Sequence, residues 1–255
     1  MSGDRPVALV TGAGRRVGIG AAVAQRLAHD GFDVALTHWP AYDARMPWGS
    51  SADDRVDPVD LVAALKGAGA RTVTVEADLE RPEAAGEIFG QVEAAVGPVS
   101  ALVMCHCESV DSGLLDTTVE SFDRHFAVNA RATWLLVAEF GRRFRGTASL
   151  GRIVAMTSDH VVGNLPYGAS KAALDRIVLA AAHELAHLGV TANVINPGAT
   201  DTGWMSPAVE AAALAVTPLG RLGQPADAAN LVSFLCSADG GWVNGQLLKS
   251  NGGAA

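Results

Sequence analysis

A tyrosine and a lysine stand four positions apart in the stretch YGASK, as Tyr167 and Lys171. Residues at this spacing share one face of a helix, so the phenol and the ammonium group come close together if the stretch is helical. A phenol has a usual pKa of about 10, and a nearby ammonium group lowers that pKa by stabilising the phenolate. Ser158 ends the preceding apolar run and can hydrogen-bond a carbonyl oxygen. The three side chains indicate proton transfer to or from a carbonyl compound.

Glycines near the start of the chain, in VTGAGRRVGIG, are typical of a nucleotide-binding turn. Such glycines let the backbone approach a pyrophosphate, and the helix that follows offers free N–H groups at its N-terminus. Two alignments compete. The motif is formed either by Gly12, Arg16 and Gly18, or by Gly12, Gly18 and Gly20 in a loop two residues longer than usual.

Helical phase favours the second alignment. Ile19, Val23 and Leu27 follow one another in steps of four and form an apolar stripe, with Gly20 at the start of the helix. Moving the motif two residues earlier would turn that stripe by about 200°. We therefore expect Arg15 and Arg16 to lie in an enlarged loop.

The next apolar run ends at His38, where a dinucleotide with a free ribose 2′-OH would meet a carboxylate. Because no acid stands there, the arginine pair Arg15 and Arg16 indicates the 2′-phosphate of NADP(H) rather than NAD(H). The alternative is that both arginines are solvated charges of the loop.

Apolar runs alternate with longer helical stretches along the whole chain, which predicts a doubly wound parallel sheet with helices on both faces. The runs, each apolar on both faces as in a buried strand, are Val7–Thr11, Val34–His38, Thr72–Glu76, Ala101–Met104, Arg152–Thr157, Thr191–Ile195 and Gln246–Lys249. The predicted helices are 19–29, 57–68, 82–96, 119–144, 167–188 and 225–237. No repeat or boundary divides residues 1–255, so we expect a single domain. Two long segments, 39–58 and the lid segment of about 199–224, begin at carboxyl ends of strands, where such sheets bind ligands.

Composition excludes several classes of partner. The net charge of −8 argues against nucleic acid and anionic membranes. No apolar run approaches the length of a membrane span, and no signal peptide is evident. The three cysteines, an odd number, are typical of reduced thiols, so we expect a cytoplasmic protein.

These features together resemble the short-chain dehydrogenase/reductase family over nearly the whole chain, and most closely the branch that includes 3-oxoacyl-carrier-protein reductases. The resemblance is carried by VTGAGRRVGIG, EADL, FAVNARAT, TS…YGASK, NVINPGATDT, PLGRLGQPADAANLVSFL and VNGQLLKSNGG. It implies a seven-stranded sheet of Rossmann type and an NADP(H)-dependent ketoreductase that moves a hydride between nicotinamide and a carbonyl or secondary alcohol. It also implies a homodimer or homotetramer.

The resemblance assigns roles to individual residues. Tyr167 would donate the proton, Lys171 would bind the nicotinamide ribose and tune Tyr167, and Ser158 would polarise the substrate oxygen. Asn129 would hold a water that links Lys171 to solvent. The implied cofactor contacts, besides the glycine loop and His38, are Asp78 and Leu79 at the adenine and Pro197, Gly198, Thr200 and Thr202 near the nicotinamide.

The chain departs from the family pattern at three places. MCHC at 104–107 stands where the family has NNAG, and SNGG replaces the closing DGG. Ser158 and Tyr167 are nine positions apart, where the family has a separation of about thirteen. Because that loop forms a wall of the substrate site, the substrate preference of relatives does not transfer.

Two other readings remain open. HELAH matches a zinc-peptidase pattern, in which His183 and His187, with Glu184 between them, would share a helix face and Glu210 is a remote third ligand. Both histidines lie opposite the apolar stripe and beside Arg176, so we expect a solvated or subunit-facing surface and no metal. The second alternative is a non-catalytic dinucleotide sensor, against which the complete proton-relay set argues.

Several further side chains are candidates for contact with a ligand or a metal. Cys105 and Cys107 would point to one face of a strand end, but a fourth metal ligand is lacking. His160 is expected at the rim of the site. Three tryptophans are candidates for ligand contact: Trp39 and Trp48 at the adenosine end, and Trp204 in the lid segment.

Overall fold

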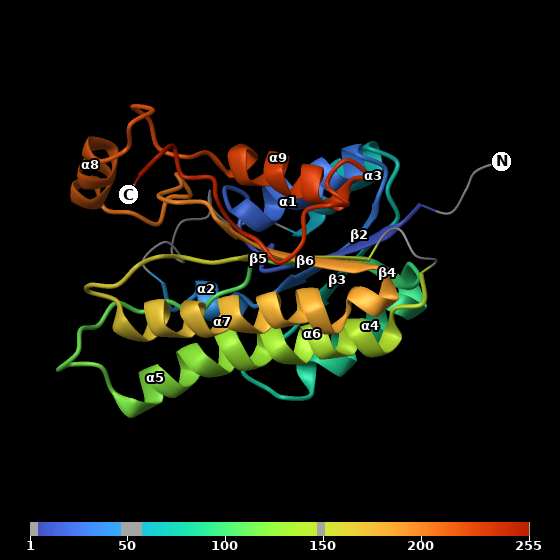
Figure 1. Ribbon diagram of the computed structural model, residues 1–255, viewed down its shortest axis with the longest axis horizontal. Helices are drawn as coiled ribbons and strands as arrows, with labels where there is room; N and C mark the ends of the chain where they lie inside the picture. Colours follow the sequence, from blue (N-terminus) through green and yellow to red (C-terminus); the bar gives the residue numbers. More distant parts are fainter. Residues whose placement is uncertain (1–4, 47–57, 147–150, 255) are drawn as a thin grey trace.

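The computed structural model describes residues 5–46, 58–146 and 151–254. Within these residues, seven parallel strands form one sheet in the order β3-β2-β1-β4-β5-β6-β7 (Figure 1). The strands are β1 (Val7–Thr11), β2 (Asp33–His38), β3 (Thr72–Glu76), β4 (Val99–Met104), β5 (Gly151–Met156), β6 (Val190–Asn196) and β7 (Leu247–Lys249). The predicted doubly wound parallel sheet is confirmed.

Helices cover both faces of this sheet (Figure 1). One face carries α1 (Ile19–His29), α3 (Pro58–Gly67) and α9 (Pro225–Cys236), and the other carries α4 (Ala84–Ala95), α6 (Ala132–Arg143) and α7 (Leu165–Glu184). The apolar side chains form two buried clusters, one on each face, and the large side chains of Phe89 and Phe140 are fully buried in the second. The two-sided cover explains why the central strands consist of apolar residues.

The edge strands differ from the sequence expectation. We predict every strand to be buried on both faces, but most side chains of β3 are only partly buried, and those of β7 are partly or fully exposed. Both strands lie at an edge of the sheet, so each has a neighbouring strand on one side only. The prediction of buried strands is wrong for these two.

The stretch 119–144 is not one regular helix. It consists of α5 (Val119–His125), a π-helical turn over Phe126–Arg131 and then α6. Asn129 lies in this wide turn, and its carbonyl accepts a hydrogen bond from Thr133 Oγ1 at 2.8 Å. Each turn of a π-helix holds more residues than an α-turn, a difference that apolar periodicity does not show.

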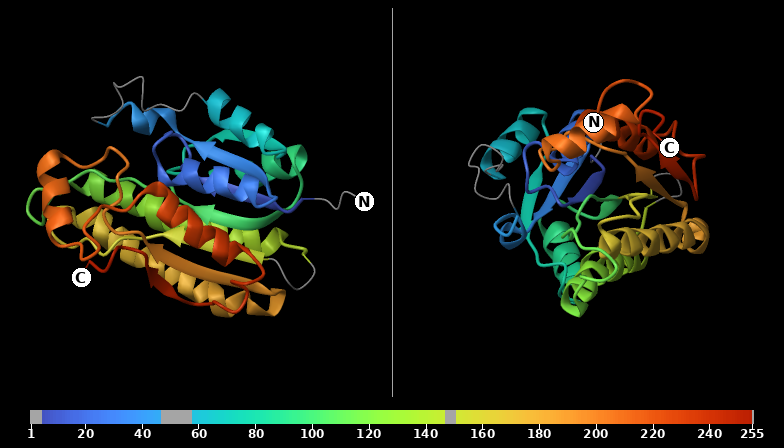
Figure 2. Two further views of the ribbon diagram at one scale, coloured as in Figure 1. Left: turned by 90° about the horizontal axis from the view of Figure 1, so that it is seen from above. Right: turned by 90° about the vertical axis from the view of Figure 1, so that its left-hand side faces the viewer.

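The carboxyl ends of the strands meet at one edge of the sheet. Two short helices that the sequence does not predict in detail lie there: α2 (Pro40–Asp43) after β2, and α8 (Pro207–Ala215) within the lid segment. α8 stands away from the sheet at this end, near the C-terminus, and the start of α7 lies at the same end (Figures 1 and 2).

Candidate active site

One cavity of about 730 Å³ opens at the carboxyl edge of the sheet. Its size is that of a small-molecule or cofactor site. Of the residues that sequence analysis proposes for the site, the structure brings these to its wall: Gly12, Arg15, Gly18, Ile19, Gly20, His38, Asp78, Leu79, Ser158, Tyr167, Lys171, Pro197, Gly198, Thr200 and Thr202. Arg16 is exposed and Asn129 is buried, and neither is part of the wall.

The glycine loop is compact because it passes close to its neighbours. Gly12 has a φ of +72°, and a Cβ there would lie 2.6 Å from the backbone of His106. A Cβ on Gly20 would lie 2.5 Å from the carbonyl oxygen of Gly12. Gly18 precedes the first residue of α1 in extended conformation, and no side chain caps this helix. The loop therefore offers close backbone and a free helix N-terminus, which fits the pyrophosphate of a dinucleotide.

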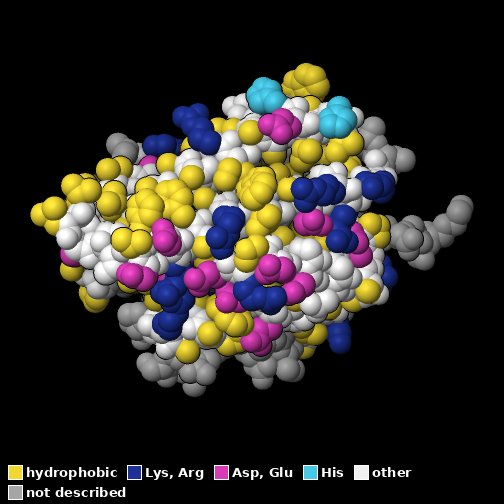
Figure 3. Space-filling model, turned by 90° about the horizontal axis from the view of Figure 1, so that it is seen from below, with side chains coloured by type: hydrophobic (Ala, Val, Ile, Leu, Met, Phe, Trp, Pro, Cys, Tyr) yellow, Lys and Arg dark blue, Asp and Glu magenta, His cyan; other side chains and the backbone are white. Residues whose placement is uncertain are grey.

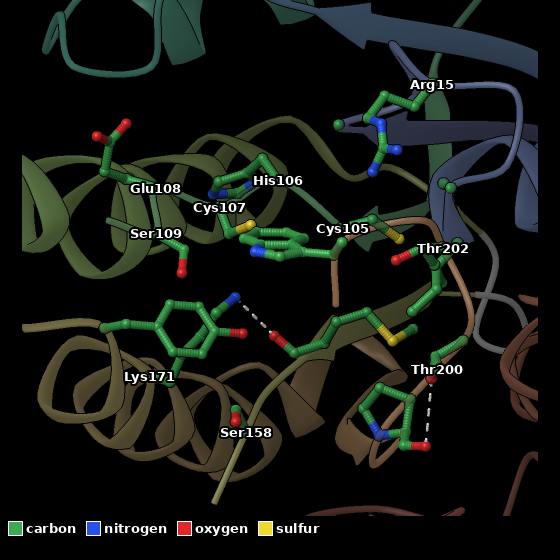
Figure 4. Close-up of a pocket in the computed structure, with 18 of the residues that line it drawn as sticks. Arg15, Cys105, His106, Cys107, Glu108, Ser109, Ser158, Lys171, Thr200 and Thr202 are labelled. Carbon is green, nitrogen blue, oxygen red and sulfur yellow. Dashed lines mark hydrogen bonds between the residues drawn. The ribbon is translucent and has the colours of Figure 1, made fainter. Parts of the chain in front are cut away.

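Arg15 and Arg16 have different surroundings. Arg15 lines the cavity, and a Cβ on Gly203 would lie 3.4 Å from its Nη2, so the guanidinium group lies beside the segment after β6. Figure 4 shows this side chain pointing from the loop into the cavity. Arg15 therefore lies at the cavity wall, whereas Arg16 is exposed and lies outside it.

A carboxylate lies near the end of β2, although the strand itself ends in His38. A Cβ on Gly14 would lie 3.4 Å from His38 Cβ and 2.9 Å from Asp43 Oδ2. Asp43 belongs to α2 and lines the same cavity. The strand end itself carries no acid in the sequence, but the turn into α2 brings Asp43 back to it.

The phenol and the ammonium group share the cavity as predicted, but their electrostatic relation differs. Lys171 Nζ lies 2.9 Å from the carbonyl oxygen of Met156 and 5.7 Å from the centre of the Tyr167 ring (Figure 4). Burial raises the pKa of Tyr167, with Cys107 adding to the rise and Ser158 opposing it. Burial also lowers the pKa of Lys171. The Tyr167 pKa is therefore raised and not lowered as predicted, because the phenol is buried.

Ser158 lies on the short loop between β5 and α7. Its Oγ accepts a hydrogen bond from the backbone N–H of His160 at 3.1 Å, and both residues line the cavity. His160 is exposed, as expected for a residue of the rim. A Cβ on Gly168 would lie 2.1 Å from the His160 carbonyl oxygen, so the shortened loop passes directly over the first turn of α7.

Asn129 lies behind the cavity wall. Its Oδ1 accepts a hydrogen bond from the Glu108 N–H at 2.8 Å, and its Nδ2 donates to the Glu108 carbonyl and to Ser170 Oγ, both at 2.9 Å. These bonds connect the π-helical turn, the segment after β4 and α7. Asn129 thus joins the cavity wall after β4 to the wall formed by α7.

In the CHC stretch after β4, His106 is buried against the glycine loop, whereas Cys105 and Cys107 are partly buried. His106 Nδ1 lies 2.6 Å from Thr11 Oγ1, and burial lowers the pKa of His106 to about 3. Burial raises the pKa of Cys105 to about 12 and also raises that of Cys107. Both thiols line the cavity and are free.

The structure adds residues to the wall that sequence analysis does not name. Glu108 is buried, and its Oε2 lies 3.0 Å from Arg45 Nη2, whose guanidinium group stacks on the Tyr42 ring at 5.5 Å. Ser109 and Asn164 also line the cavity. The only signal in the sequence is that these residues flank the recognised motifs.

Two of the three candidate tryptophans lie at the cavity wall. Trp39 and Trp204 line the cavity, and Trp48 lies outside the described residues. Asp78 and Leu79, which follow β3, lie at the wall beside the end of β2, where the adenine is expected.

The HELAH stretch does not form one helix. α7 ends at Glu184, and Ala186–Leu188 form a 3-10 turn that holds His187. The predicted helix 167–188 is thus wrong at its end, and the two exposed histidines lack the shared α-helical face that the zinc hypothesis requires. Among the residues that the structure describes, no cluster of three or more His, Cys, Asp and Glu is arranged to hold a metal ion.

No helix in the described part of the chain has the length and apolar character needed to cross a membrane.

Comparisons with known proteins agree with the fold. The family model described as enoyl-(acyl carrier protein) reductase matches residues 12–255. The uncharacterized oxidoreductase YjdA of Bacillus subtilis is 34% identical and covers 97% of this chain and 96% of its own. The 3-oxoacyl-[acyl-carrier-protein] reductase MabA of Mycobacterium bovis is 34% identical, with 96% of this chain and 91% of its own covered.

A solved structure shows the same likeness. The blue fluorescent protein from a metagenomic library, in complex with NADPH, superposes with a TM-score of 0.85 at 31% identity and covers 98% of each chain. The present chain has the parallel sheet and the glycine loop, and it matches these relatives over nearly its whole length. The protein described here therefore belongs to the short-chain dehydrogenase/reductase family of oxidoreductases.

Proposed function

We propose that the protein is an NADP(H)-dependent ketoreductase, in which Tyr167 exchanges a proton with the oxygen of a ketone or secondary alcohol. The observation that carries the proposal is that Tyr167, Lys171 and Ser158 line one cavity with the glycine loop. The nicotinamide supplies or accepts the hydride when bound. Ser158 holds the substrate oxygen, and Asn129 keeps the wall behind Lys171 in place.

The choice of NADP(H) over NAD(H) rests on two kinds of support. The NADPH bound in a structural relative with 31% identity supports it, and so does the lack of an acid at His38 itself. Asp43 opposes it, since a carboxylate near the end of β2 suits a free 2′-OH and repels a phosphate. We assign Arg15 to the shared pyrophosphate, because it lies beside Gly203, and Arg16 with His38 to the 2′-phosphate.

The test is a Tyr167→Phe variant. We expect turnover of ketones with NADPH to fall by about 10²–10⁴-fold, the usual contribution of a positioned acid. Binding of NADPH, followed by nicotinamide fluorescence, stays within twofold of the native protein (roughly 0.4 kcal/mol). A variant that keeps full turnover overturns the proposal. A native protein that binds NADPH but reduces no carbonyl compound supports the dinucleotide sensor instead.

Assembly and location complete the proposal. We propose a cytoplasmic homodimer or homotetramer joined through the long helices. Val119, Phe122 and Trp134 of α5 and α6 are exposed, and Figure 3 shows hydrophobic side chains gathered between charged ones on the face that these helices form. Light scattering on the purified protein measures the assembly, and a monomer at micromolar concentration would contradict it.

A further inference from the structure

The loop after β4 makes a second polar contact with the start of α7, apart from the proton-transfer residues. Asn164 precedes α7 and is buried, and its Nδ2 lies 2.9 Å from Ser109 Oγ and 2.6 Å from Asp111 Oδ1. The backbone adds a bond from the Leu165 N–H to the Ser112 carbonyl at 2.9 Å. Ser109, Asp111 and Asn164 all line the cavity. The loop and the helix are therefore joined at the cavity wall.

The direction of these hydrogen bonds follows from the chemistry of the partners. A carboxylate only accepts, so Asn164 turns its NH₂ group toward Asp111, and the same group donates to Ser109 Oγ. Ser109 thus accepts one bond and keeps its own O–H for another partner. The Oδ1 of Asn164 is buried and has no hydrogen-bond partner among the described residues. A buried acceptor without a partner, on a residue that lines a cavity, is a place where the donor group of a ligand can bind.

The position of Ser109 connects this pair to the reaction. In Figure 4 its hydroxyl points into the cavity, and Lys171 lies between it and Ser158. Ser158 is the proposed partner of the reacting carbonyl oxygen. Ser109 therefore faces a different part of the same substrate.

We propose that Ser109 and Asn164 form a subsite for a hydroxyl group of the substrate, so that hydroxy ketones are the preferred substrate class. The proposal rests on the ketoreductase function proposed above. A hydroxyl accepts from Ser109 and donates to Asn164 Oδ1, whereas a second carbonyl only accepts and leaves Asn164 unsatisfied. Asp111 is a positioning residue, because it orients the Asn164 amide.

The experiment compares ketones of matched shape in the presence of NADPH. One pair is hydroxyacetone and butanone, and the other is 4-hydroxy-2-butanone and 2-pentanone. The measured quantity is the ratio of kcat/KM within each pair. We expect Ser109→Ala to lower this ratio by about 3- to 10-fold for at least one pair, the factor that a neutral hydrogen bond represents. Because the native protein and the variant are measured with the same ketones, differences in the intrinsic reactivity of the ketones cancel.

A matched control removes a hydroxyl from the same loop. Ser112 does not line the cavity, and its Oγ lies 2.9 Å from Thr117 Oγ1, so Ser112→Ala leaves both ratios unchanged. Asn164→Ala also lowers the ratio, but it loosens the loop, so its melting temperature is measured alongside. Ser109→Ala keeps the bond between Asn164 and Asp111, so the test stays valid if Asn164→Ala does not fold.

The outcomes separate this inference from the function on which it rests. Ratios that Ser109→Ala leaves unchanged, with all four ketones turned over, overturn the subsite alone. A larger effect of Ser109→Ala on methyl acetoacetate than on 4-hydroxy-2-butanone overturns the choice of a hydroxyl. Bound NADPH with no turnover of any ketone overturns the ketoreductase function itself.

Discussion

The ammonium nitrogen of Lys171 donates a hydrogen bond to the carbonyl oxygen of Met156, which ends β5, and lies 5.7 Å from the centre of the Tyr167 ring. The side chain is thus fixed to the sheet before any substrate arrives. Its charge is compensated by a backbone dipole, and the neighbouring phenol has a raised pKa. This arrangement makes the role of Lys171 open to direct measurement.

Replacing Lys171 by Met removes that charge and keeps much of the side-chain volume. We expect kcat/KM for ketone reduction to fall about 10- to 100-fold, the factor of a charged hydrogen bond worth ~1.5–3 kcal/mol. Lys66→Met, on the exposed side of α3, is the matched control and keeps full activity. Equal kinetics of the two variants would show that the Lys171 charge has no part in the reaction.

The close approach at Gly20 leads to a prediction about stability. Gly20→Ala puts a methyl group against the Gly12 carbonyl oxygen, and we expect the free energy of unfolding to fall by about 1–3 kcal/mol. Gly90→Ala in α4 is the control, because nothing lies within 4 Å of its Cβ position. That change raises the free energy of unfolding by about 0.5–1 kcal/mol, since alanine suits a helix better. Urea denaturation checks both, and a stabilised Gly20→Ala protein would refute the tight turn.

His106 makes the stability depend on pH. Its folded pKa is about 3, below the usual 6.5, so between these values the unfolded chain binds a proton that the folded chain does not. The free energy of unfolding therefore decreases as the pH falls below 6.5, by about 1.4 kcal/mol per pH unit from this residue. Denaturation between pH 7.5 and 4.5 should show a shallower slope for His106→Gln. The exposed His160→Gln serves as control and should retain the native slope.

Arg15 and Arg16 carry equal charges one position apart and should act on different phosphates. Arg15→Ala should weaken the binding of NADPH and of NADH by the same factor, about 10-fold or more for a charged contact. Arg16→Ala should weaken the binding of NADPH alone.

Asp43→Asn should strengthen the binding of NADPH relative to that of NADH, because it removes a negative charge near the end of β2. Calorimetric titration of both nucleotides distinguishes the three effects, and an Arg15 effect restricted to NADPH would reverse the assignment.

Sequence patterns predict the parts of the molecule that depend on local periodicity. The apolar stripe of α1 selects Gly20 over the competing alignment, and the close contact between Gly20 and Gly12 agrees with that choice. The alternation of strands and helices predicts the sheet, and the spacing of Tyr167 and Lys171 places both in one cavity.

The remaining features depend on contacts between distant segments. The pairing of Arg45 with Glu108 joins residues 63 positions apart, and the bond of Asn164 to Ser109 spans 55. No periodicity records such pairs. The direction of the Tyr167 pKa shift is not predictable from the sequence for a related reason: it depends first on how deeply the phenol is buried and then on its neighbours Cys107 and Ser158.

The wide turn at Phe126–Arg131 has a consequence for changes in chain length. A π-turn holds about one residue more than an α-turn, so loss of one residue there would let α5 and α6 join as an unbroken α-helix. Every side chain on one side of the deletion would rotate by about 100° relative to the other side. Asn129 would then leave the backbone of Glu108, although the helical content would hardly change. Circular dichroism would report an intact protein whose two cavity walls had lost their common anchor.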